Sequence, residues 1–153
     1  MYPAVVGKEK VIGNIVRYQI NKEIKRICIV GDSMVYFKPI IYKKLKEIEG
    51  VTVSEEYPND WSKLPAVTYS EEDNSTYEVV DNKEVTCRII YRIDVWNDKS
   101  TSEVVLKIDE AITQLGLKRT FCKDAPTPSG LKHKVFRYEG IVDIKTFRVY
   151  QRN

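Results

Sequence analysis

Apolar and polar residues alternate most regularly along residues 85–96, and this pattern predicts a long β-strand. Arg88 and Arg92 belong to its polar face. The apolar face takes every second position: Val85, Cys87, Ile89, Tyr91, Ile93 and Val95. A period of two with one apolar face is typical of a sheet that is covered on one side. We therefore expect this strand to be the central spine of a sheet.

Two segments with helical spacing of apolar residues are expected to cover that face. The first spans 39–49, with Pro39 at its start and Gly50 just past its end. The second follows Ser100 and Glu103, which have the spacing of a capping box, and it closes at Gly116. Its apolar stripe comprises Val104, Ile108, Ala111, Ile112 and Leu115.

Shorter patterns complete the expected sheet, with strands at 51–57, 64–69, 117–123 and 135–144. Residues 71–83 are predicted to be an acidic loop that joins two antiparallel strands as a long hairpin, and Gly140 to mark a bulge. Residues 146–150 extend the sheet or lie along a partner. The fold class is therefore α+β, an antiparallel β-sheet with two helices packed on one face.

The start of the chain has a mixed pattern. The pairs Gly13-Asn14 and Gly31-Asp32 between apolar residues indicate tight hairpins, whereas the isoleucines from Ile12 to Ile27 also keep helical spacing. We favour β structure here. Residues 1–38 are thus predicted to form an N-terminal extension or arm, and residues 39–153 the α+β domain.

Composition indicates one domain of 153 residues, with an ordinary hydrophobic fraction of 42%. No apolar run has transmembrane length, and the start lacks the features of a signal peptide, so we expect a cytoplasmic product. The three cysteines, Cys28, Cys87 and Cys122, form no C-x-x-C pair. We interpret them as small buried hydrophobes.

Charge is distributed unevenly although the net charge is only +3. Residues 1–49 carry a net +5, residues 50–82 a net −7, and residues 83–153 a net +5. Opposite patches on one chain can steer copies of it into a head-to-tail assembly. An ordinary mixed surface is the alternative interpretation.

The sequence contains no recognisable catalytic or cofactor motif. The single histidine, His133, has no cysteine or carboxylate at ligand spacing, and Asp32-Ser33 fits a turn better than an esterase site. The acidic groups at 55–56 and 71–73 lack the spacing of a calcium loop. We expect no enzyme activity, no cofactor and no metal.

Nucleic-acid binding is an alternative from another class of function. Basic residues at 118–119 and 132–134 lie near Phe121, Phe136 and Tyr138, as in a basic aromatic surface. The small overall charge and the acidic middle of the chain disfavour a small nucleic-acid-binding module.

The order of five motifs carries a resemblance to a known family. These are Leu64-Pro65-Ala66-Val67-Thr68-Tyr69-Ser70-Glu71, Tyr91-Arg92-Ile93-Asp94-Val95-Trp96-Asn97, a helix with Val105, Ile108 and Asp109, Leu115-Gly116-Leu117-Lys118-Arg119-Thr120, and Phe136-Arg137-Tyr138-Glu139-Gly140. Over residues 39–143 the chain resembles the tail terminator, or tail-completion, proteins of tailed bacteriophages and phage-derived tail-like particles.

The resemblance implies a structural protein of the virion tail, made in the host bacterial cytoplasm. Such proteins form a hexameric ring of identical subunits that caps the tail tube, ends its growth and offers a surface to the head-tail connector; contractile tails add contact with the sheath. It implies no catalytic residues and no specific nucleic acid, beyond passage of a genome through the ring. A head-tail connector or neck protein of related fold is the nearest alternative.

The charged residues of the predicted hairpin are the candidate subunit or tube interface. They are Glu71, Glu72, Asp73, Asp81, Arg88 and Arg92. A ring needs one heterologous contact repeated until it closes, and an acidic segment facing a basic one would supply its register. The N-terminal extension is expected to reach a neighbouring subunit, the sheath or the connector.

Overall fold

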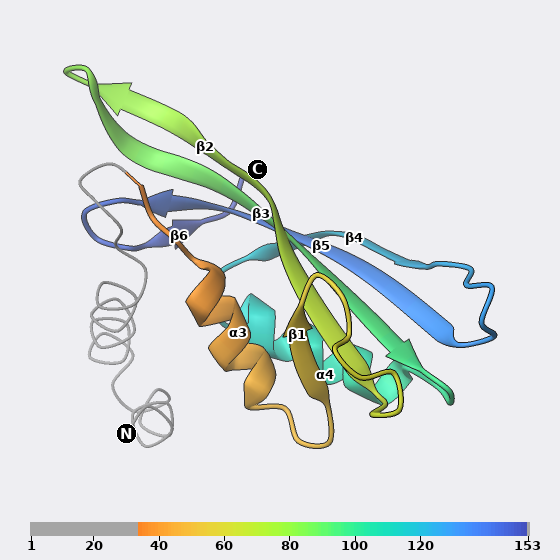
Figure 1. Ribbon diagram of the computed structural model, residues 1–153. Coiled ribbons are helices and arrows are strands. Elements are labelled where there is room, and N and C mark those ends of the chain that lie inside the picture. Colours follow the sequence, from red (N-terminus) through yellow and green to blue (C-terminus); the bar gives the residue numbers. More distant parts are fainter. Residues whose placement is uncertain (1–33, 153) are drawn as a thin grey trace.

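One long hairpin organises the sheet of the computed structural model, which describes residues 34–152. Its strands are β2 (Ala66–Val80) and β3 (Lys83–Asn97). The other strands are β1 (Thr52–Glu55), β4 (Lys118–Asp124), β5 (Lys132–Asp143) and β6 (Val149–Tyr150). They are arranged in the order β1-β2-β3-β5-β4, with β6 paired to β5 (Figure 1). The predicted central place of β3 is confirmed.

Two helices cover one face of this sheet, as the sequence predicted (Figure 1). They are α3 (Lys38–Lys46), with Pro39 in its first turn, and α4 (Ser102–Thr113). The core lies between them and the apolar face of β3 and β5, where Tyr91 and Tyr138 face each other on adjacent strands and are fully buried. The α+β class is therefore confirmed.

The folded domain includes residues that precede α3. Val35 and Phe37 are fully buried in the core, and the Asn74 side-chain amide donates a hydrogen bond of 2.9 Å to the Val35 carbonyl. Residues 34–38 therefore pack with the domain. The rest of the predicted N-terminal extension, residues 1–33, lies outside the described residues.

The sheet is mixed, whereas the sequence predicted an antiparallel one. β1 runs parallel to β2, with Thr52 opposite Ala66 and Glu55 opposite Tyr69. The connection over residues 56–65 carries the chain back along the sheet, so that both strands enter it from the same end. Parallel pairing requires such a crossover, and alternation within a short strand does not encode direction.

The predicted acidic loop at 71–83 is wrong, because most of it is strand. β2 continues to Val80, and only the turn at Asp81 and Asn82 separates it from β3. Both turn residues have positive φ, 51° and 59°, as in the tight turns of two-residue hairpins. The far end of β2 is exposed on both faces, so it shows no hydrophobic alternation. A hairpin is present, as expected.

Three local predictions were also wrong. Cys122 was interpreted as buried, but it is exposed on β4. Thr101, not Ser100, precedes the first residue of α4, and Glu103 binds Lys107 at 2.7 Å instead of completing a capping box. Gly140 pairs with Ile89 without a bulge. A Cβ atom at position 140 would lie 2.6 Å from the Leu117 side chain, so glycine permits close packing of β5 there.

Candidate assembly surface

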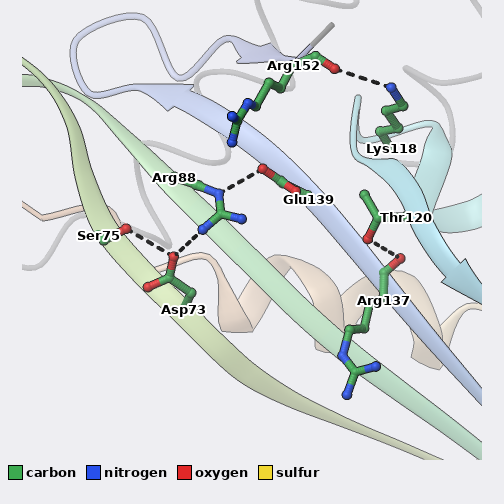
Figure 2. Close-up of polar contacts among 8 residues, drawn as sticks. All are labelled: Asp73, Ser75, Arg88, Lys118, Thr120, Arg137, Glu139 and Arg152. Atoms are coloured by element: carbon green, nitrogen blue, oxygen red, sulfur yellow. Dashed lines mark hydrogen bonds and ion pairs between the residues drawn. The ribbon is translucent and has the colours of Figure 1, made fainter.

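The helix-free face of the sheet carries a row of ion pairs that link three strands. Arg88 of β3 donates from Nε to Glu139 Oε1 at 2.7 Å and from Nη1 to Asp73 Oδ2 at 3.0 Å (Figure 2). Ser75 donates to the same Asp73 oxygen at 3.0 Å. The hydrogen bond to Glu139 is the main cause of the raised pKa of Arg88. This cluster ties β2, β3 and β5 together.

A second pair spans the same three strands. Arg137 of β5 donates from Nε to Glu72 Oε2 at 2.7 Å, across β3. Its guanidinium lies 4.9 Å from the ring centre of Phe121 on β4. A register shift in β2 between Glu71 and Asp73 places the Glu72 carboxylate for this contact.

A third cluster lies near the end of β3 that leads to α4. Asp94 receives two hydrogen bonds of 2.7 Å from Arg92, and its second oxygen lies 2.9 Å from His133 Nε2. The His133 ring stacks on Trp96 with ring centres 4.5 Å apart, and Trp61 meets Trp96 edge-on at 5.5 Å. The hydrogen bond to Asp94 is the main cause of the raised pKa of Arg92.

The structure thus brings together only part of the predicted interface. Asp73 and Arg88 are direct partners, whereas Glu72 and Arg92 bind residues outside the predicted set. Glu71 accepts a hydrogen bond from the Tyr91 hydroxyl. Asp81 is exposed in the hairpin turn. Much of the acidity of β2 is therefore balanced within the subunit.

The end of the hairpin has a surface that the sequence analysis missed. We call residues 77–84 the hairpin end. Tyr77, Val79 and Val80 are each about half exposed there, at 51%, 55% and 52%. Figure 1 shows the hairpin end projecting beyond the helices at the upper left. The apolar Val79-Val80 pair was a signal in the sequence, but it was assigned to an acidic loop.

Within residues 34–152, part of β2 and the outer side of β4 have strand edges that pair with no other strand. β1 covers β2 only as far as Tyr69, and no other described strand pairs with that side of β2. On the opposite side, β4 pairs only with β5, and all seven of its residues are exposed. Open edges on both sides are potential interaction sites for other chains.

A cavity of about 920 Å³ lies between the start of α4 and the loop that joins β4 to β5. We call it the end cavity. Apolar side chains contribute much of its lining, among them Val105, Leu106, Pro126 and Leu131, and Lys132 adds positive charge. Leu106 is 71% exposed.

Several basic residues of the candidate nucleic-acid surface form ion pairs or hydrogen bonds within the subunit. Arg119 pairs with Asp109 at 2.9 Å, and Lys134 with Asp124 at 3.0 Å. Lys118 donates to the Arg152 carbonyl at 3.2 Å (Figure 2). Within residues 34–152, no group of three histidine, cysteine or acidic residues is arranged to hold a metal ion. None of the helices in this range is long and apolar enough to cross a membrane.

Solved structures include proteins to which this chain is similar. No family model matches the chain, and no curated protein matches it. Among solved structures, it is similar to one described as the structure of bacteriophage SPP1 gp17 protein, at 14% identity and a TM-score of 0.42. The match covers 67% of this chain and 86% of the other.

Proposed function

We propose that this protein is a structural component of a phage or phage-like tail, and that it acts as a tail terminator. In this role identical subunits form a ring, six in number by the family resemblance, on the end of the tail tube. The ring ends elongation and offers a surface to the head-tail connector, and in a contractile tail to the sheath as well. The chain would be part of the virion tail.

The observation that carries the proposal is the exposed hairpin end, residues 77–84. β2 and β3 are 15 residues each, but the helices cover only part of that length (Figure 1). This hairpin end adds little stability to its own subunit, because none of residues 77–84 is buried. Such a projection fits a protein that is completed by neighbouring chains, as a ring subunit is.

The order of motifs supports the same role. The five motifs that resemble tail terminators fall on β2, β3, α4, β4 and β5, so they follow the sheet and its second helix continuously. Arg137 and Glu139 of the last motif form ion pairs with β2 and β3, as expected of an assembly scaffold.

Tube polymerisation tests the proposal directly. The tail tube protein is allowed to polymerise with and without the purified full-length chain, and tube lengths are measured by electron microscopy. We expect shorter tubes with a ring at one end when the chain is present. In particles assembled without it, we expect overlong tubes or tails that fail to join heads. Normal tube lengths in both experiments would refute a terminator role.

The same preparations address the alternatives. A connector or neck protein would bind the portal complex and leave tube length unchanged. A nucleic-acid-binding module would slow the migration of DNA in a gel, and added salt would weaken this effect. Deletion of residues 1–33 tests the predicted role of the extension and keeps Val35 and Phe37, which are buried in the core.

A further inference from the structure

The hairpin end and the end cavity lie at opposite ends of the same strand. β3 begins at Lys83, in the hairpin end, and finishes at Asn97, which pairs with Lys132 at the cavity. At about 3.3 Å per residue, the 15 residues of β3 separate the two sites by about 50 Å. A hairpin end therefore cannot enter the cavity of its own subunit, but it can enter that of another copy.

The two surfaces are complementary in polarity. The hairpin end presents three half-exposed apolar side chains, and five of the 13 residues that line the end cavity are apolar: Val105, Leu106, Ala125, Pro126 and Leu131. A cavity of about 920 Å³ is large enough to bury several side chains. Burial of both surfaces would remove apolar area from water on each partner.

Their charges are also opposite. The hairpin end carries Glu78, Asp81 and Glu84 against the single Lys83, a net charge of −2. Within the described residues, no ion pair involves Glu78 or Asp81. The cavity wall carries Lys132 and Lys134 against Asp124. Such complementarity steers encounter and fixes orientation.

We infer that the hairpin end of one copy docks into the end cavity of the next copy. The contact is heterologous, since each subunit gives one surface and receives the other, and repeated contacts close into a ring or continue as a filament. This inference rests on the proposed function for the ring, and it identifies the surfaces through which the ring would form.

Two exposed-surface variants test the contact. The hairpin variant combines Tyr77→Thr and Val79→Thr, and the cavity variant is Leu106→Glu; all three side chains are exposed in the subunit, so folding should persist. Each variant should weaken self-association about thirtyfold, since it removes or opposes partial burial of apolar side chains. Tyr57→Thr, at another exposed aromatic residue, is the matched control and should associate normally.

Mixing the two variants gives the sharpest result. The hairpin variant keeps an intact cavity, and the cavity variant keeps an intact hairpin end. Sedimentation velocity and native mass spectrometry should therefore find a 1:1 heterodimer and nothing larger. Independent homodimers, or no heterodimer while the control assembles, would overturn the inference.

Disulfide trapping can detect the contact even if the subunits associate only weakly in solution. A chain with Val80→Cys, Thr127→Cys and Cys122→Ser should give a ladder of linked subunits on oxidation, because Thr127 lines the cavity. A protein that stays monomeric and forms no ladder would overturn the contact.

If the chain caps tubes and both variants cap equally well, the contact between subunits is refuted but the proposed tail role stands. If rings form through this contact but tube length is unchanged, the proposed tail role is refuted and the contact between subunits stands.

Discussion

Replacement of Arg88 by methionine should destabilise the subunit chiefly through the carboxylate of Glu139. The Glu139 side chain is only 15% exposed, whereas that of Asp73 is 32% exposed. Hydrogen bonds to charged groups contribute about 1.5–3 kcal/mol each, and exposed ion pairs about 0–1 kcal/mol. We therefore expect Arg88→Met to lower the free energy of unfolding by about 2 kcal/mol, mostly from the unpaired Glu139.

Double-mutant cycles measured by urea unfolding separate the two contributions. Arg88→Met is combined with Glu139→Gln in one cycle and with Asp73→Asn in the other. The coupling energy should be about 1–2 kcal/mol with Glu139 and below about 0.5 kcal/mol with Asp73. The exposed pair of Lys107 with Glu103 provides a control, and Lys107→Ala should cost less than about 0.5 kcal/mol.

The reverse order of coupling would refute this reasoning. If Asp73 couples to Arg88 more strongly than Glu139 does, burial does not determine the strength of these pairs. If neither pair couples, the charged row adds no stability to the sheet. High salt should reduce the Asp73 coupling more than the Glu139 coupling, because exposed pairs are screened more effectively.

Three further predictions concern local packing, titration and the hairpin turn. Gly140→Ala should lower the free energy of unfolding by about 1–2 kcal/mol, because the new Cβ atom would crowd Leu117. Adding Leu117→Val should recover part of the lost stability, and thermal unfolding of both variants measures the difference. Burial raises the pKa of the Cys87 thiol to about 11 from 9.0, so the fold favours the neutral thiol and stability should fall between these pH values, by up to about 1.4 kcal/mol per pH unit. Urea titrations at pH 8 and 10 check this, and Cys87→Ala should flatten the slope. Asn82→Gly should raise stability by about 0.5 kcal/mol, whereas Asn82→Val should lower it by about 1–2 kcal/mol, since φ is 59° there; chemical unfolding measures both.

Local pattern was sufficient for the elements that pack on the core. The alternation along β3 predicted its buried face, and Cys87, Ile89, Ile93 and Val95 are at most 1% exposed. The spacing of Val104, Ile108 and Ile112 likewise predicted the buried side of α4. In these segments burial and periodicity coincide, so each residue type reports its environment.

The pattern failed where a strand lies outside the core. Residues 75–80 at the far end of β2 are all exposed and are held by backbone pairing to β3, so no alternation of apolar and polar residues marks them as a strand. The parallel direction of β1 and the close packing at Gly140 depend on segments far away in the sequence. No local pattern encodes such contacts.

The sequence by itself determined the fold class, the central strand, the two covering helices and the uneven distribution of charge. Only the tertiary structure decided which charges remain available to a partner. It pairs Glu72 with Arg137 and Asp73 with Arg88, because neighbouring strands bring these side chains together across the sheet. It also places the exposed hairpin end and the end cavity at opposite ends of β3, since an extended strand carries the chain the length of the domain.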